Sequence, residues 1–372
     1  MRFLTPRYSG GGFEMTDTYM PEPIVSINLV TWNGEKYVRD FAESLRAQTF
    51  RDFSVRVVDN GSTDRTVSIL RELLPEAMII QNTKNLGFAQ GHNQGFRAAM
   101  PRFDSSQLHD RFIWCMNQDI VLKPDALEKL ISCAKNNPEC GSLQPKLLRL
   151  YSENINDESL FQNVKSDRID STGVSVSKSL RFTDRGAGEL DLGQFDSKLD
   201  IFGANGACAF YRASALESAK IFGEYFDEDF FSYKEDVDLA WRLQLLGFCS
   251  LFAPDAVAYH YRGVYGAQKA GLFEQVFRRR SRRPLISFLS TRNQWLVMKK
   301  NMHFINALIL LPRIAIFQFS VLAYLFLFEQ KTLMAIFSAM RLLPRILKKR
   351  RAIMRLSKQS GVKPKQIRKL FV

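Results

Sequence analysis

Short apolar runs alternate with amphipathic stretches along the N-terminal half of the chain. Residues 24–30 are rich in β-branched side chains and predict a strand, while the apolar positions of residues 38–45 recur at helical spacing. Residues 53–58 predict a second strand and complete one βαβ unit. The alternation continues with strands expected at 78–81 and 112–116 and helices at 67–74, at 88–100 and after Pro124. Such alternation predicts an α/β fold with a Rossmann-like parallel sheet that binds ligands at its carboxyl edge.

Polar residues follow the expected strands. Thr31 and Asn33 come after the first strand, Asp59 and Asn60 after the second, and Gly87 after the third. The absence of G-x-x-x-x-G-K-[ST] and G-x-G-x-x-G loops argues against a P-loop ATPase and a standard dinucleotide dehydrogenase. A carboxylate such as Asp59 can accept a hydrogen bond from the imide N–H of uracil or thymine, which favours a pyrimidine nucleotide. A well-formed turn explains the same residues equally simply.

The fourth strand ends in a group of potential metal ligands. Asn117, Gln118 and Asp119 follow it directly, and the acidic pair at residues 235–236 and His260 lie downstream. Oxygen ligands suit a hard divalent cation such as Mg²⁺ or Mn²⁺, and the imidazole of His260 favours Mn²⁺ or leaves the choice open. The alternative is a polar strand end that caps the next helix.

Charge divides the chain into two parts. Residues 1–274 carry 30 Lys and Arg against 37 Asp and Glu, a balance of −7, whereas residues 275–372 carry 22 against 1, a balance of +21. An acidic globular part followed by a basic appendage predicts an anionic partner for the appendage. We expect that deleting the residues after about Arg278 releases the protein from membranes without unfolding the acidic part.

The basic part also contains a long apolar stretch, Phe304 to Phe328, which Pro312, Arg313 and Gln318 interrupt. A transmembrane span needs about 20 clean apolar residues, so Arg313 favours interfacial or re-entrant helices. We expect the basic tail at residues 341–369 to contact anionic lipid headgroups. Nucleic-acid binding is the alternative, but the cations flank apolar helices and not an aromatic reading surface, so no nucleic-acid partner is expected.

The cysteines and the N-terminus bear on the compartment. The five cysteines are scattered within apolar runs and show no zinc or disulfide spacing, which predicts small buried thiols in a reducing compartment. Residues 1–23 contain no apolar core of a secretory signal. We expect them to form a disordered extension.

Several ordered motifs closely resemble those of the inverting family-2 glycosyltransferases of the A-type fold. The resemblance covers residues 24–262, and the overall pattern is most similar to bacterial rhamnosyltransferases of O-antigen and cell-wall synthesis, which use dTDP-rhamnose. The motifs lie at residues 25–33, 57–64, 85–89 with Gly91, Asn93 and Gly95, 117–119, 203–208 and 234–242.

The resemblance implies a role for each motif residue. The metal motif of the family usually reads Asp-x-Asp, so only Asp119 remains as its carboxylate, and His260 matches a position that supplies an imidazole to the same ion. Asp236 matches the general base that an inverting displacement requires. Glu235 is the rival base or orients the acceptor. The remaining expected contacts are Thr31, Asn33, Asp59, Asn60, Gly87, Asn93, Asn117 and Gln118 with the nucleotide-sugar, and Asn205, Gly206 and Glu235 with the acceptor.

Without the resemblance, the acidic residues at 235, 236 and 238 would be interpreted as the charged first turn of a helix with a buried apolar face. With it, we expect a catalytic domain at 24–262, in which residues 151–200 form a variable acceptor-side insertion, and a helical membrane-associating region at 263–372. The expected reaction moves a sugar, L-rhamnose from dTDP-rhamnose, onto a polyprenyl-linked saccharide at the cytoplasmic face of the plasma membrane, with the protein peripheral or monotopic. The alternatives are a UDP- or GDP-sugar donor, a non-catalytic nucleotide-sugar-binding protein and a sugar nucleotidyltransferase, which would need an N-terminal Gly-rich loop.

Overall fold

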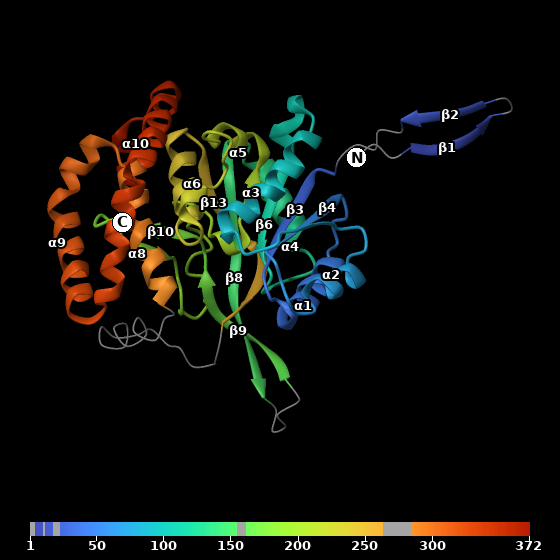
Figure 1. The fold of residues 1–372 in the computed structure, drawn as a ribbon, viewed down its shortest axis with the longest axis horizontal. Helices are drawn as coiled ribbons and strands as arrows, with labels where there is room; N and C mark the ends of the chain where they lie inside the picture. Colours follow the sequence, from blue (N-terminus) through green and yellow to red (C-terminus); the bar gives the residue numbers. More distant parts are fainter. Residues whose placement is uncertain (1–3, 10–11, 18–22, 155–160, 263–283) are drawn as a thin grey trace.

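The computed structural model describes residues 4–9, 12–17, 23–154, 161–262 and 284–372 (Figure 1). A nine-stranded mixed sheet runs through the middle of the molecule in the order β5-β4-β3-β6-β12-β8-β13-β7, and β9 pairs with β8 outside this path. Its strands are β3 (Val25–Thr31), β4 (Phe53–Asp59), β5 (Met78–Gln81), β6 (Phe112–Asn117), β7 (Ile120–Leu122), β8 (Cys140–Asn154), β9 (Phe161–Ser171), β12 (Phe210–Arg212) and β13 (Cys249–Tyr261).

The predicted βα alternation is confirmed for β3 to β6, which pair in parallel. β3 lies between β4 and β6 with nearly every residue buried, which explains its continuous apolar run. Beyond β6 the sheet becomes mixed, because β12 pairs antiparallel with both β6 and β8. The helices of this part are α1 (Glu35–Arg46), α2 (Thr66–Leu73), α3 (Gly87–Ala99), α4 (Ala126–Asn136), α5 (Ala213–Ala219) and α6 (Glu235–Leu245).

The expected acceptor-side insertion contains the end of β8 and the strands β9, β10 (Val174–Val176) and β11 (Phe182–Asp184). The long strand β8 pairs antiparallel with β9, and β10 pairs with β11 as a separate two-stranded sheet. The N-terminal extension differs from the disorder that we predicted, since β1 (Leu4–Ser9) and β2 (Gly12–Asp17) pair as an antiparallel hairpin.

The C-terminal region is packed onto the catalytic part, contrary to the predicted separability. It comprises α8 (Pro284–Asn301), α9 (Phe304–Phe328), α10 (Met334–Ser360) and α11 (Pro364–Lys369). One apolar cluster includes Trp241 of α6, Val297 of α8, Leu310 of α9 and Ile353 of α10. Cutting the chain near residue 278 would therefore expose a core, and not simply release a tail.

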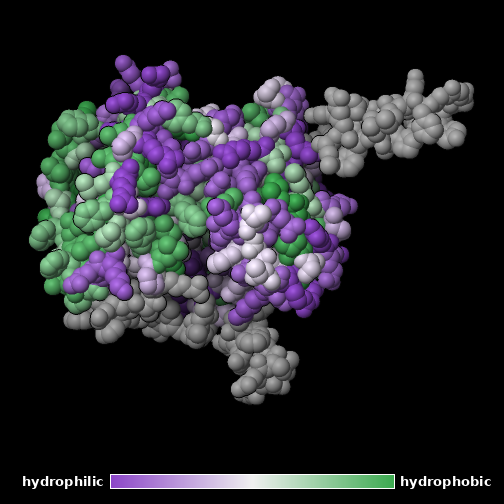
Figure 2. Space-filling model, in the orientation of Figure 1, coloured by the Kyte–Doolittle hydropathy of each residue, from purple (hydrophilic) through white to green (hydrophobic). Residues whose placement is uncertain are grey.

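Helix α9 is continuous through Pro312 and Arg313, although these residues interrupt its apolar run. Within the described residues, it is the one helix long and apolar enough to cross a membrane, and little of it is buried. Hydrophobic side chains gather over the α9 side of the molecule (Figure 2). The apolar stretch is thus confirmed as an exposed surface, whereas its length and composition fit either a span or an interfacial helix.

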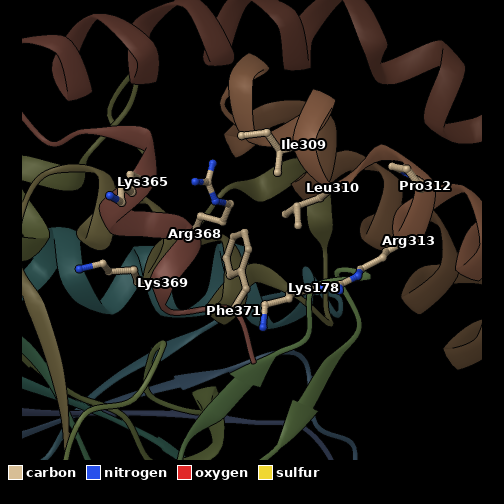
Figure 3. Close-up of a pocket in the computed structure, with 9 residues that line it drawn as sticks. All are labelled: Lys178, Ile309, Leu310, Pro312, Arg313, Lys365, Arg368, Lys369 and Phe371. Carbon is tan, nitrogen blue, oxygen red and sulfur yellow. The ribbon is translucent and has the colours of Figure 1, made fainter.

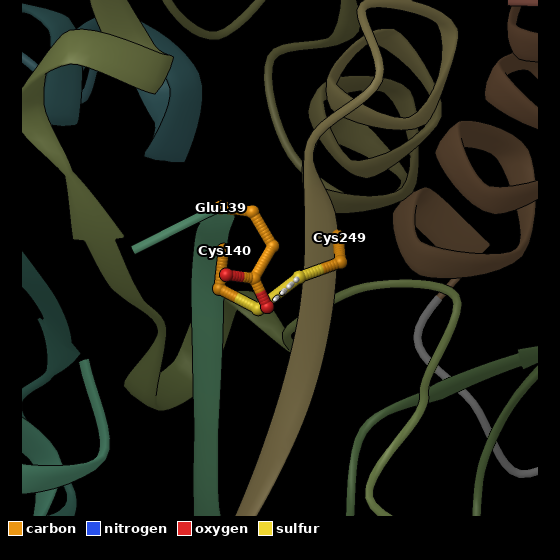
Figure 4. A group of neighbouring side chains, drawn as sticks. All are labelled: Glu139, Cys140 and Cys249. Atoms are coloured by element: carbon orange, nitrogen blue, oxygen red, sulfur yellow. Dashed lines mark hydrogen bonds between the residues drawn. A yellow bond between two sulfur atoms is a disulfide. The ribbon is translucent and has the colours of Figure 1, made fainter. Parts of the chain in front are cut away.

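The prediction of five free thiols is wrong for two of them. Cys140 and Cys249, which begin the parallel strands β8 and β13, form a disulfide although 109 residues separate them (Figure 4). Glu139 lies beside them, but the bonded sulfurs offer no thiolate to a metal ion. The sequence could not show this pair, because its two members meet only through the pairing of β8 with β13.

Candidate active site

Residues from the ends of β3 and β4 form the first part of the site. Thr31 and Asp59 are neighbours in register across these strands. Asp59 is buried, and its carboxylate accepts hydrogen bonds from the Ser62 backbone N–H, at 3.1 Å, and from the Ser62 hydroxyl. The Asn33 side-chain oxygen accepts the backbone N–H of Thr63 at 2.9 Å. The bond between Asn33 and Thr63 joins the turns after β3 and β4. Thr31, Asn33 and Asp59, which were predicted to contact the nucleotide-sugar, therefore lie in one group.

Gln118 joins this group from the adjacent strand end. Its side-chain oxygen accepts the Thr31 hydroxyl at 2.5 Å and the Trp32 backbone N–H at 2.9 Å. Asn117, the last residue of β6, pairs with Val30 of β3. The structure thus brings the ends of β3, β4 and β6 together, as the sequence predicted, although Gln118 is engaged with the turn after β3.

The turn before α3 packs against the same group. The Asn60 side-chain nitrogen donates to the carbonyl oxygen of Gly87 at 3.0 Å. Gly87 has a φ of +84°, and a Cβ there would lie 2.5 Å from the carbonyl oxygen of Phe231. Glycine is therefore required both for the backbone conformation and for the close approach of the Phe231 loop.

Asn93 does not fit its predicted role as a donor contact. It is fully buried on α3, and its side-chain nitrogen donates to the carbonyl oxygen of Phe226 at 2.8 Å and to Glu228 at 2.9 Å. Its side-chain oxygen accepts the backbone N–H of Phe226. Both ends of the amide are occupied, so Asn93 anchors the loop after Phe226 and has no free group for a ligand.

Asp119 and His260 lie together, as predicted, and bring a partner that we did not predict. The Nε2 atom of His260 lies 3.3 Å from Oδ1 of Asp119, and its Nδ1 atom lies 2.8 Å from Oδ2 of Asp170. Arg262 donates from Nε to the other oxygen of Asp170 at 2.8 Å. Asp170 is the penultimate residue of β9, in the segment whose details the sequence did not reveal.

Burial and charge act in opposite directions in this cluster. Burial lowers the pKa of His260, but the negative charge of Asp119 and the imidazole's contacts with the carboxylates of Asp119 and Asp170 outweigh it and raise the pKa to about 9. Burial raises the pKa of Asp170, yet the hydrogen bond with His260 and the charge of Arg262 hold that pKa below its ordinary value. Without a bound cation, the imidazole therefore carries a proton at neutral pH.

Asp119 and His260 fit a divalent cation. Oδ1 of Asp119 is buried and makes no hydrogen bond of good geometry. Its 3.3 Å separation from Nε2 of His260 is close to the roughly 3.0 Å expected between neighbouring ligands of an ion bound at about 2.1 Å. Asp170 would orient the imidazole through its hydrogen bond with Nδ1, as carboxylates commonly do for metal-bound histidines.

Asp236 lies in the first turn of α6 beside the turn at Gly206. Its Oδ2 atom accepts the backbone N–H of Gly206 at 3.0 Å, and Oδ1 accepts that of Val237 at 2.7 Å. The neighbouring Asn205 donates its side-chain amide to Asp184 at 2.5 Å. The residues predicted to meet the acceptor are therefore adjacent, and Asp184 is a further member that the sequence analysis missed.

Asp184 interacts electrostatically with both halves of the site. Burial raises its pKa, and the negative charges of Asp170 and Asp236 raise it further. Its hydrogen bond with Asn205 places it on the predicted acceptor side.

The side chain of Glu235 differs from that of Asp236 in its hydrogen bonding. It is buried, and one of its carboxylate oxygens has no hydrogen-bond partner among the described residues. Burial raises the pKa of Glu235 well above its ordinary value, and the charge of Asp236 adds to the rise. Burial thus disfavours the charged form of Glu235, whereas both carboxylate oxygens of Asp236 accept backbone N–H groups, which favours Asp236 over Glu235 as the base.

The loop before α6 is strained and is held by the C-terminal region. Phe231, Tyr233 and Lys234 all have φ between +63° and +74°, a conformation that side chains other than glycine rarely adopt. The buried Asn293 of α8 donates to the carbonyl oxygens of Phe230 at 2.9 Å and of Tyr233 at 2.7 Å, and also to that of Ser232. The helices after the catalytic part thus shape the turn that carries Asp236.

Buried ion pairs reinforce this attachment. Lys300 of α8 lies between Asp227 and Asp238, with Nζ 2.8 Å from Asp238, and all three side chains are almost fully buried. Lys349 of α10 contacts Asp227 as well and reaches Asp229 at 2.9 Å. The acidic loop before α6 and the first turn of that helix therefore take their counter-charges from the basic C-terminal region.

Comparisons with known proteins agree with this geometry. The sequence model described as "Glycosyl transferase family 2" matches residues 26–218, which is more than half of the chain. The chain is a family-2 glycosyltransferase. This enzyme has the A-type fold of the family, and its predicted fold class is confirmed.

Its relatives include rhamnosyltransferases. The glycosyltransferase is 28% identical over 255 residues, 67% of this chain and 77% of the relative, to the N-acetylglucosaminyl-diphospho-decaprenol L-rhamnosyltransferase of Mycobacterium tuberculosis. It is 20% identical over 239 residues, 63% of this chain and 49% of the relative, to the poly-beta-1,6-N-acetyl-D-glucosamine synthase of Staphylococcus epidermidis. The pattern is most like that of the rhamnosyltransferases, as the motifs indicated.

A solved structure shares the fold. GalNAc-T7 with UDP, GalNAc and Mn²⁺ superposes with a TM-score of 0.53 at 10% identity, covering 77% of this chain and 49% of that one. The glycosyltransferase thus spans about half of that protein, and the likeness concerns the fold alone.

Proposed function

We propose that this enzyme transfers L-rhamnose from dTDP-rhamnose to a polyprenyl-linked saccharide, with inversion and with Asp236 as general base. The observation that carries the proposal is the contrast between two adjacent carboxyl groups. Burial raises the pKa of Glu235 well above its ordinary value, whereas Asp236 is held in place by two backbone N–H groups beside the Asn205 turn. One site thus offers a fixed proton acceptor next to a carboxyl group whose charged form burial disfavours.

The displacement uses Asp236 directly. The acceptor hydroxyl gives its proton to the Asp236 carboxylate while its oxygen bonds to the anomeric carbon of the donor sugar. The bond from that carbon to the nucleoside diphosphate breaks on the opposite side, and the diphosphate leaves with the electron pair. Asp59 and the turns after β3 and β4 hold the nucleotide, and a divalent cation held by Asp119 and His260 would supply positive charge beside the departing diphosphate.

The names of the relatives support the choice of substrates. The mycobacterial relative is named for L-rhamnose transfer to a decaprenol-linked N-acetylglucosaminyl diphosphate. A lipid acceptor also suits the exposed apolar helix α9. We propose on the same grounds that the enzyme works at the cytoplasmic face of the plasma membrane. Labelled dTDP-rhamnose, UDP-sugars and GDP-sugars, supplied separately to the membrane fraction, identify the donor by the label that enters the lipid.

Asp236→Asn tests the base. We expect turnover to fall by about 10²–10⁴-fold, while donor affinity measured by calorimetry on the same preparation stays unchanged, because the base acts on the acceptor. Asp255→Asn, at an exposed position of β13, is the matched control. A variant that keeps more than about a tenth of the wild-type rate would exclude Asp236 as the base.

Glu235→Gln separates the two carboxyl groups. Glutamine resembles a protonated glutamic acid in shape and in its ability to donate, so turnover should stay within a few-fold of wild type. A loss as large as that of Asp236→Asn would instead transfer the role of base to Glu235.

A further inference from the structure

A cationic cavity lies outside the catalytic site, between α9, α11 and the turn after β10. Its volume is about 510 Å³ (Figure 3). Lys178 comes from the turn, Arg313 from α9, and the other cations from α11. In Figure 3 they surround the space together with apolar side chains of α9. The five cations are Lys178, Arg313, Lys365, Arg368 and Lys369.

The charges of this cavity are not balanced by the protein. Within the described parts of the chain, none of the five cations lies within 4 Å of a carboxylate, and Arg368 donates only to the amide oxygen of Asn306, at 3.3 Å. Lys300 and Lys349 of the same region are, by contrast, each paired with buried carboxylates. Lys300 and Lys349 stabilise the fold and are neutralised by carboxylates. The cavity cations form no such ion pairs with the carboxylates that the structure describes, and their concave arrangement favours an anionic ligand.

The walls of the cavity favour an amphiphile over a water-soluble anion. Ile309 and Leu310 line it, and Ile309 is 53% exposed. Leu308 and Leu311 beside them are also more than half exposed, on a helix with the length and composition of a membrane segment. Phosphate groups beside a polyprenyl or acyl chain match cations that border an apolar surface.

A short hairpin connects this cavity with the acceptor side of the active site. At one end of the hairpin, Val174 pairs with Asp184, which accepts the hydrogen bond from Asn205. At the other end, the backbone N–H of Lys178 donates to the carbonyl oxygen of Val372 beside the cavity. Four residues of extended chain span at most about 13 Å. A hexose and the diphosphate on its anomeric carbon bridge a comparable length.

We propose that this cavity holds the diphosphate of the polyprenyl-linked acceptor while its sugar reaches Asp236. The identity of the lipid rests on the proposed function, whereas binding of a lipid diphosphate can be measured without it. Ile309 and the exposed face of α9 would lie along the first part of the prenyl chain. The basic C-terminal region then serves two purposes, since some of its cations stabilise the fold and others bind the substrate.

Arg313→Gln combined with Lys369→Gln tests the site, because both residues are exposed and the folded core should tolerate their change. Arg355→Gln combined with Lys358→Gln removes the same charge from exposed positions of α10 outside the cavity and is the control. The full-length proteins are assayed in one neutral detergent with a polyprenyl-diphosphate saccharide and with a neutral alkyl glycoside of the same sugar. We expect KM for the diphosphate acceptor to rise at least about tenfold in the cavity variant only, the factor that 1.4 kcal/mol represents. The neutral acceptor should be used equally by all three proteins.

Direct binding separates this proposal from the proposed function. Farnesyl diphosphate, inorganic pyrophosphate and anionic phospholipid micelles are titrated in turn, without donor. We expect farnesyl diphosphate to bind the wild type and the control, and the cavity variant to bind it at least about tenfold more weakly. Equal losses in both variants, or preferential binding of pyrophosphate or phospholipid, would overturn the proposal. If wild type binds farnesyl diphosphate through the cavity but transfers no sugar to any lipid, only the proposed function fails.

Discussion

Lys300→Met tests whether the C-terminal helices are part of the catalytic fold. The substitution keeps the apolar stem of the side chain and removes its charge, which lies 2.8 Å from Asp238 in a nearly solvent-free position. Removing one partner of a buried ion pair destabilises a protein by about 3–5 kcal/mol. Asp238 keeps Arg242 at 3.0 Å, and Asp227 keeps Lys349, so we expect the lower end of that range, about 3 kcal/mol.

The expected result is an unfolding temperature lower by about 4 °C, followed through tryptophan fluorescence of the full-length protein in detergent. Lys358→Met, an exposed lysine of α10, is the control and should leave the temperature unchanged. Turnover should fall as well, because Asp238 lies two residues beyond the proposed base. Equal unfolding temperatures of Lys300→Met and Lys358→Met would refute the reasoning and would mean that the C-terminal region does not stabilise the catalytic part.

The stability difference between wild type and Lys300→Met should depend on pH. Burial raises the pKa of Asp227, but the charges of Lys300 and Lys349 outweigh it, so the pKa lies below its ordinary value of 3.8. A lowered folded-state pKa stabilises the protein above pH 3.8, and this contribution is lost as the pH falls further. We expect the difference between wild type and Lys300→Met to be largest near neutral pH and to narrow below about pH 4. A constant difference from pH 7 to pH 3 would contradict this account.

Asp119→Ala and His260→Ala should each weaken binding of the nucleotide-sugar in the presence of Mn²⁺ or Mg²⁺, measured by calorimetry, and should lower turnover in parallel. Full activity of the wild-type enzyme in excess chelator would mean that Asp119 contacts the sugar or the ribose instead. Asn293→Ala removes three hydrogen bonds from the strained loop before α6 and should lower turnover at least about tenfold with donor affinity kept. Thiol titration of the unfolded, unreduced protein should find three free thiols, because Cys140 and Cys249 are joined; five would show that the bond does not form in the cell.

Most of the catalytic half could be predicted because its signals are local. The apolar run of β3, the helical spacing of α1 and the polar residues at each strand end all lie within a few residues of one another. Parallel strands then bring Thr31, Asp59 and Asn117 to one edge without further information. The proximity of Asp119 and His260 was expected from the family resemblance, and the antiparallel pairing of β13 with β7 brings the two residues together.

What could not be predicted depends on contacts between distant segments. Asp170 became a partner of His260 only through the pairing of β9 with β8, and Asn93 was occupied by a loop more than 130 residues away. The charge division misled us for a related reason. A balance of −7 followed by +21 suggested two independent parts, but Lys300 and Lys349 neutralise carboxylates of the catalytic half.

The late position of these lysines in the chain has a consequence for biosynthesis. Lys300 follows Asp238 by 62 residues, and Lys349 follows Glu224 by 125. A growing chain therefore completes its sheet while the acidic loop before α6 still lacks its cations and the face that α8 and α10 will cover is bare. Contacts this distant in sequence form late, and apolar surface left open meanwhile is prone to aggregation. The loop before α6 gains its full set of counter-charges only after the exposed apolar helix α9 has been synthesised, because Lys349 follows α9 in the chain.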